Sequence, residues 1–228
     1  MAKIKFSGVA VVDMRGKLNG SVMSKNRAGA YVRTKVTPVN PNTLSQQQAR
    51  ASLTDRSQSW RGLTQAQRDA WNAAVQDFQR TDIFGDLRVP TGKNLYTLLN
   101  INLLNAGQSA ISVPPSPAAV PAIFNTGVTI SVGAPTYEVA YGGAGASVRV
   151  LVWATAAQSP GKNFVKSEYR LIGDFAGNAA SPYDFEADYL AKFGAPAVGS
   201  KVFVGLQPVN IATGQAGIMS SESTIVVA

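Results

Sequence analysis

The sequence predicts an α+β protein, with a β-hairpin and three helices in the first half and an all-β sandwich in the second. Glycine-punctuated β-type runs stand near the start, two threonines with capping-box spacing come after them, and short β-rich runs fill the chain beyond residue 122. We therefore expect residues 1–110 to form a basic hairpin-plus-helices domain, residues 111–121 a proline-rich linker and residues 122–228 the sandwich.

The predicted hairpin lies in the stretch MRGKLNGSVMSKNRAGAYVRTK. Its two β-type runs, residues 21–24 and 30–36, are bracketed by glycines, and a further strand is expected over residues 4–12. In the second run, apolar residues alternate with tyrosine, arginine and lysine. Because side chains of a strand point alternately to its two faces, this alternation predicts one apolar face and one basic face.

Two helices are expected to begin after the hairpin, and Pro38 and Pro41 separate the hairpin from the first of them. Thr43 and Thr64 each precede a glutamine by three residues, which is the capping-box spacing. A third helix is predicted over residues 92–106, before a glycine stop.

Apolar stripes on the first two helices predict that these helices pack as an antiparallel pair. Tryptophan is often an anchor of protein–protein interfaces. Because Trp60 and Trp71 lie on these stripes, however, we expect both to pack in the helical core. The stripes consist of Ala49, Leu53 and Trp60 on the first helix, and of Ala70, Trp71, Ala74, Val75 and Phe78 on the second.

The second half reads as about seven short strands, which is typical of an immunoglobulin-like or fibronectin III-like sandwich. The segment SVPPSPAAVP before it is uncharged and proline-dense, as in stiff interdomain linkers. Trp153 is a candidate core residue of the sandwich, and residues 183–192 are expected to form a short helix. Three acidic residues stand at the start of that helix, where the helix dipole stabilises negative charge. Their spacing does not fit a calcium-binding loop.

The positive charge is confined to the first half. Residues 1–110 hold 15 Lys+Arg against 6 Asp+Glu, a net charge of +9, and residues 111–228 hold 6 against 7, a net charge of −1. We expect the basic arm to bind an acidic protein surface, with nucleic-acid binding through its phosphates as the alternative. The candidate partner-binding residues are Lys17, Lys25, Arg27, Tyr31, Arg33 and Lys35.

The chain has no cysteine and no histidine, which removes thiol nucleophiles, imidazole bases and the usual zinc ligands. No serine-hydrolase motif or phosphate loop is present either, so we expect neither catalysis nor a cofactor or metal. The N-terminus lacks the pattern of a signal peptide, and no apolar run is long enough to predict a membrane span.

Three strings resemble structural proteins of tailed bacteriophages, in particular of crAss-like phages and related Bacteroidota elements. They are MRGKLNGSVMSKNRAGAYVRTKVTPVNPNT, SQSWRGLTQAQRDAW and GKNLYTLLNINLLNAG, which cover most of residues 14–107. The later strings WATAAQSPGKNFVKSEYRLIGDF and VGLQPVNIATGQAG resemble the β-sandwich modules that accompany such N-terminal domains. The resemblance carries over no catalytic residue.

This resemblance implies a virion protein, most simply a capsid auxiliary or decoration protein present in several copies. Its partners would be other virion proteins, such as the major capsid protein or a portal or tail protein, or further copies of the same chain. A head-tail or portal-vertex ring, or a tail adaptor, is the first alternative. A DNA-binding accessory protein of packaging is the second.

Overall fold

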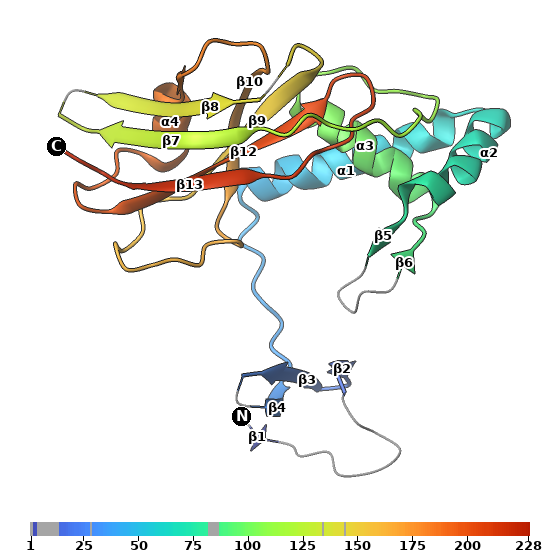
Figure 1. Ribbon diagram of the computed structural model, residues 1–228. Helices are drawn as coiled ribbons and strands as arrows, with labels where there is room; N and C mark the ends of the chain where they lie inside the picture. Colours follow the sequence, from blue (N-terminus) through green and yellow to red (C-terminus); the bar gives the residue numbers. More distant parts are fainter. Residues whose placement is uncertain (1, 4–13, 28, 82–86, 134, 144) are drawn as a thin grey trace. The chain divides into compact units, whose positions relative to one another are not determined.

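The computed structural model describes residues 2–3, 14–27, 29–81, 87–133, 135–143 and 145–228 (Figure 1). Helices and antiparallel strands are both present, which confirms the α+β class. The chain forms two compact units, Met1–Gln47 and Gln48–Ala228. The sequence predicted the boundary at residues 111–121 instead. In the structure, contacts join the helices before this segment to the strands after it.

The first unit contains a four-stranded antiparallel sheet with the order β1-β4-β3-β2. The predicted hairpin is its centre, and two short strands flank it. The strand predicted over residues 4–12 lies outside the described residues. The strands are β1 (Ala2–Lys3), β2 (Gly16–Leu18), β3 (Ser21–Asn26) and β4 (Gly29–Thr34).

Three helices come next in the chain: α1 (Leu44–Gly62), α2 (Gln65–Ala74) and α3 (Gly92–Asn105). Both predicted helix starts are confirmed. Thr64 forms a complete capping box with Gln67, and Thr43 exchanges hydrogen bonds of 3.3 and 3.4 Å with Gln46. A 3-10 turn (Val75–Phe78) and the pair β5 (Arg80–Thr81) and β6 (Leu87–Arg88) connect α2 to α3.

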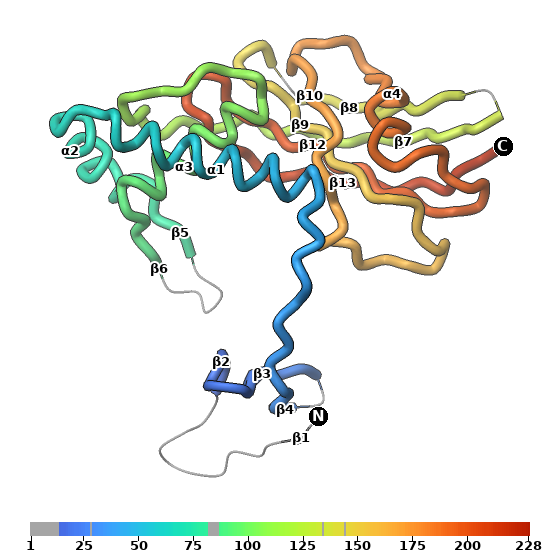
Figure 2. Tube along the Cα trace, turned by 180° about the vertical axis from the view of Figure 1, so that it is seen from behind, coloured from blue at the N-terminus to red at the C-terminus, as the bar shows by residue number. Residues whose placement is uncertain are grey.

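The predicted pairing of α1 with α2 is wrong, because α2 packs against α3 (Figure 2). The buried cluster of this region consists of Trp71, Val75, Leu95, Tyr96 and Leu99, with Trp60 as a partly buried neighbour. The α1 helix contains no buried residue, and Leu53 of its predicted stripe is 54% exposed. Only the end of α1 near Trp60 joins this cluster, through a ring contact with Tyr96.

The second half forms two antiparallel sheets that share one core (Figure 1). One sheet has the order β11-β8-β7 and the other the order β10-β9-β12-β13. The core contains residues of both sheets together with Phe185 and Tyr189. The elements are β7 (Phe124–Ser131), β8 (Thr136–Gly142), β9 (Val148–Ala154), β10 (Arg170–Ala176), β11 (Tyr183–Asp184), α4 (Glu186–Phe193), β12 (Lys201–Asn210) and β13 (Ser220–Ile225).

Trp153 does not lie in the core between the sheets, so its predicted place is wrong. In β9, Val150, Val152 and Ala154 belong to that core, whereas Leu151 and Trp153 face the other side. There they form a second apolar cluster with Ala106, which caps the end of α3. The alternation of the strand therefore divides β9 between two cores.

Contacts on this second side join the helices to the sheets. The Asn102 side chain donates a hydrogen bond of 2.8 Å to the Gly214 carbonyl. Gly214 has a φ of +70°, and a Cβ added to it would lie 2.3 Å from the carbonyl oxygen of Leu99. The backbone of α3 and the turn after β12 thus approach each other as closely as a glycine allows.

The predicted linker is also bound in place. Ile111 exchanges hydrogen bonds with the Asn100 side chain, and the Ala118 amide donates one of 2.8 Å to Gln215. Proline content predicts stiffness along the chain but says nothing of such lateral contacts. Residues 111–121 therefore connect parts that already belong to one compact unit.

Candidate partner-binding surface

The four-stranded sheet of the first unit shows no buried side chain in the part whose burial the structure describes. Among residues 14–27 and 29–47, none is buried, and the strand β2 is exposed along its whole length. Every buried apolar side chain of the described chain belongs to the second unit, from Trp71 onward. A small sheet normally needs an apolar face covered by another element to be stable in water. The lack of burial among residues 14–27 and 29–47 is the main structural property of this surface.

Local turn chemistry explains why this segment forms a sheet. β2 and β3 are joined by Asn19 and Gly20, and Asn19 has a φ of +50°. Asn-Gly is a favoured sequence of two-residue hairpin loops, and here Asn19 takes a positive φ whereas Gly20 does not. The strand β2 was not predicted from the sequence, although this dipeptide was the signal that could have revealed it. Gly29, with a φ of +113°, begins β4.

The register of the sheet places three candidate residues on one face. Val22 lies opposite Arg33 on one side and opposite Lys17 on the other, while Tyr31 is two positions from Arg33 along β4. Directly opposed residues of antiparallel strands point to the same face, as do residues two apart in one strand. Lys17, Tyr31 and Arg33 therefore form one surface, which we call the basic face.

The remaining candidates are distributed differently. Lys35 continues the ladder beyond β4, with its amide 2.8 Å from the carbonyl oxygen of Gly20, and the alternation places it on the side of Arg33. Arg27 lies in the turn between β3 and β4. Lys25 pairs with Ala30, which sets it on the opposite face from the basic face. Of the six candidates, Lys25 is thus separated from the rest by register.

The face opposite the basic face is the more apolar one. Met23 lies opposite Val32 in the ladder, and Leu18 is 63% exposed at the end of β2. Beside the edge of β2, a cavity of about 270 Å³ is lined by Met14, Arg15, Gly16, Lys17, Leu18 and Met23.

The electrostatics of the sheet are one-sided. Residues 1–47 contain eight Lys+Arg and one Asp+Glu, a net charge of +7, and no acid occurs between residues 14 and 47. The rest of the chain contains 13 Lys+Arg against 12 Asp+Glu, a net charge of +1. Residues 36–47 carry no charge at all, so the basic residues end abruptly at Lys35. The field of this segment favours an acidic partner.

Comparison with family models, with curated proteins and with solved structures gives no match. Within the part of the chain that the structure describes, no helix combines the length and apolar character needed to cross a membrane. The same residues contain no group of three or more acidic side chains placed to hold a metal ion. Asp184, Glu186 and Asp188 instead surround the start of α4, where Asp184 accepts a hydrogen bond of 2.9 Å from the Glu186 amide.

Proposed function

We propose that this chain is a structural protein of a bacteriophage virion, a capsid auxiliary or decoration protein that docks through its first unit. The phage setting rests on the resemblance of residues 14–107 to structural proteins of tailed phages. The mode of attachment rests on the basic sheet of the first unit. Docking and display are the roles proposed for the two units, and the chain would act without catalysis.

The observation that carries this proposal is a sheet without a single buried side chain among residues 14–27 and 29–47. Covering the apolar groups of the basic face, such as Val22 and the ring of Tyr31, would gain roughly 25 cal/mol for each Å² removed from water. The second unit has its own apolar clusters and does not need the first. A surface on another molecule is therefore the natural cover for this sheet.

The second unit supplies the displayed part. Seven antiparallel strands divided between a three-stranded and a four-stranded sheet support the expectation of an immunoglobulin- or fibronectin III-like module. Domains of that architecture occur widely on surfaces, where their loops are accessible. We propose that this module is the part of the chain that is displayed on the particle.

A DNA-binding accessory protein of packaging remains the second candidate, because one observation favours it. Tyr31 shares the basic face with Lys17 and Arg33, and aromatic rings between cations are suited to contact nucleic acid. A ring or adaptor protein at the portal or tail would use the same docking chemistry as a decoration protein. It would differ in copy number per particle.

The test is incorporation of the full-length chain into particles that lack it, measured by co-sedimentation. We expect Arg33→Glu to reduce co-sedimentation strongly, because the charge of the basic face is reversed. Lys25→Glu is the matched control, since Lys25 is also exposed on the same hairpin but on the opposite face. Added salt should weaken attachment of the unchanged protein, because exposed charges are screened.

Equal losses for both variants would show that net charge, and not the basic face, governs attachment. Full co-sedimentation of Arg33→Glu would refute docking through this face. The same proteins are measured against duplex DNA in a salt series. Salt-sensitive DNA binding that Arg33→Glu abolishes, together with unchanged incorporation, would favour the packaging role.

A further inference from the structure

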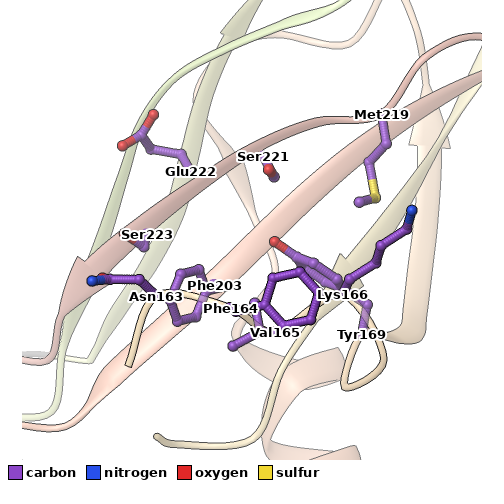
Figure 3. Close-up of a pocket in the computed structure, with 10 residues that line it drawn as sticks. All are labelled: Asn163, Phe164, Val165, Lys166, Tyr169, Phe203, Met219, Ser221, Glu222 and Ser223. Carbon is purple, nitrogen blue, oxygen red and sulfur yellow. The ribbon is translucent and has the colours of Figure 1, made fainter. Parts of the chain in front are cut away.

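A cavity of about 380 Å³ lies on the outer face of the four-stranded sheet, between β12, β13 and the segment that precedes β10 (Figure 3). It belongs to the second unit and lies apart from the basic face in the sequence. Its volume is within the usual range of small-molecule sites, about 300 to 1,000 Å³. The lining residues are Asn163, Phe164, Val165, Lys166, Tyr169, Phe203, Met219, Ser221, Glu222 and Ser223.

Aromatic rings from different segments border this cavity. Phe203 of β12 is nearly buried at 8% exposure, whereas Phe164 is 78% exposed. Tyr169 presents a third ring, and burial raises the pKa of its hydroxyl. An exposed phenylalanine side chain adds little to the stability of the fold, so the ring of Phe164 is available to contact a ligand.

The segment that carries Phe164 is held in place by contacts on both sides. Gln158 and Lys201 exchange backbone hydrogen bonds of 2.8 and 2.9 Å. Lys162 forms an ion pair with Glu168 and hydrogen bonds to Gln158. The Lys201 ammonium lies 3.0 Å from the Asn163 side-chain oxygen and 5.1 Å from the centre of the Phe203 ring. A site fixed in this way loses little freedom when a ligand binds.

The polar groups of the lining restrict the chemistry of the ligand. The charged lining residues Lys166 and Glu222 are both exposed, and the register sets Glu222 on the face of β13 opposite Phe203, so neither charge is enclosed in the cavity. The nearby Lys201 ammonium is already bound to Asn163. Ser221, Ser223 and Asn163 offer groups that both donate and accept hydrogen bonds. The complementary ligand is uncharged, carries hydroxyls at its edges and has an apolar face for the rings.

We propose that this cavity binds a neutral saccharide, with one pyranose ring against Phe164 and its hydroxyls toward the serines and Asn163. The axial C–H groups of a pyranose form the apolar face that the rings require, and its equatorial hydroxyls reach the polar side chains. This assignment does not depend on the proposed attachment to particles, because all the residues involved belong to the second unit.

The test uses the full-length protein on a printed array of oligosaccharides. Neutral oligomers of glucose, galactose and N-acetylglucosamine stand beside sialylated and sulfated ones. We expect binding to a subset of the neutral oligomers, and Phe164→Ala should weaken it by about tenfold, as measured by ligand-observed NMR on the bound oligomer. Phe124→Ala is the matched control, since Phe124 is 61% exposed on β7 and does not line the cavity.

Because Phe164 and Phe124 are both exposed, neither change threatens the fold. Lys166→Gln combined with Glu222→Gln should leave binding of the neutral oligomers within a few-fold, because no ligand charge is recognised. The proposal is overturned if no neutral oligomer binds, if only sialylated or sulfated oligomers bind, or if Phe164→Ala and Phe124→Ala have the same effect.

Discussion

The indole Nε1 of Trp71 donates a hydrogen bond of 2.9 Å to the backbone carbonyl of Ser112. The ring itself is fully buried and meets Tyr96 edge-on at 5.4 Å between centroids. One side chain of α2 thus closes the helical core and fixes the start of the proline-rich segment.

Replacement of Trp71 by phenylalanine should lower the free energy of unfolding by about 2 to 4 kcal/mol. The loss has two parts, since a cavity forms in the core and the Ser112 carbonyl loses its donor. Urea unfolding followed by circular dichroism measures it. Leu53→Ala, at an exposed position of α1, should change the same quantity by less than about 0.5 kcal/mol. Similar values for the two variants would contradict the assigned packing.

Asn100 is a fully buried polar residue whose side chain satisfies both backbone groups of Ile111. Asn100→Leu should therefore destabilise the chain by about 2 to 4 kcal/mol, because it leaves the Ile111 amide and carbonyl without these partners. The measurement is the urea midpoint. Leu104→Ala on the same helix, where the side chain is 40% exposed, serves as control and should have a smaller effect. A neutral Asn100→Leu change would mean that water replaces the lost bonds.

Limited digestion with a protease of broad specificity should cut within residues 36–43 before it cuts within residues 109–122. The first segment is exposed throughout and has no regular structure, whereas the second is held by Asn100, Trp71 and Gln215. Mass spectrometry of the early fragments should find a resistant piece that starts near Gln48. Early fragments that end between residues 109 and 122 would instead support the interdomain linker predicted from the sequence.

Alkaline pH should destabilise the fold through Tyr189. Burial raises the pKa of Tyr189 from 10.0 to about 12, and its hydroxyl donates a hydrogen bond of 3.2 Å to the Thr155 carbonyl. Since the folded pKa exceeds the unfolded one, this contribution is complete below pH 10 and is lost as the pH rises toward 12. The lost stability amounts to about 2 to 3 kcal/mol.

Urea unfolding at several pH values between 9 and 12 tests this dependence. Tyr189→Phe should show a shallower fall in stability over that range, although other buried tyrosines with raised pKa values, such as Tyr137 and Tyr141, still contribute. The same slope in both proteins would show that Tyr189 does not ionise in this range.

Local signals in the sequence predicted local structure well. The starts of α1 and α2 could be predicted from Thr43 and Thr64, whose partners lie three residues away, and α3 from its leucines before Gly107. Strand positions in the second half could be predicted from β-rich runs between turn residues, although the run over residues 165–172 starts before β10, which begins at Arg170. There the chain makes a turn that Val165 anchors as a buried residue.

Relationships between distant residues could not be predicted in the same way. The burial of Trp71 and the exposure of Leu53 depend on α3, which arrives some 20 to 40 residues later in the chain. The binding of residues 111–121 depends on Asn100 and Gln215, which lie on either side of that segment. The faces of the candidate surface depend on register, so Lys25 and Arg33 look equivalent in the sequence but not in the sheet.

The close approach of Gly214 to Leu99 bears on how the chain melts. Since no side chain fits between α3 and the turn after β12, these two backbone segments meet directly at Gly214 and Leu99 and cannot separate without exposing this contact. Heat should therefore unfold residues 48–228 in one cooperative transition, with equal calorimetric and van't Hoff enthalpies. A methyl group at position 214 would act as a wedge at that boundary, and the single calorimetric peak should then broaden or divide in two.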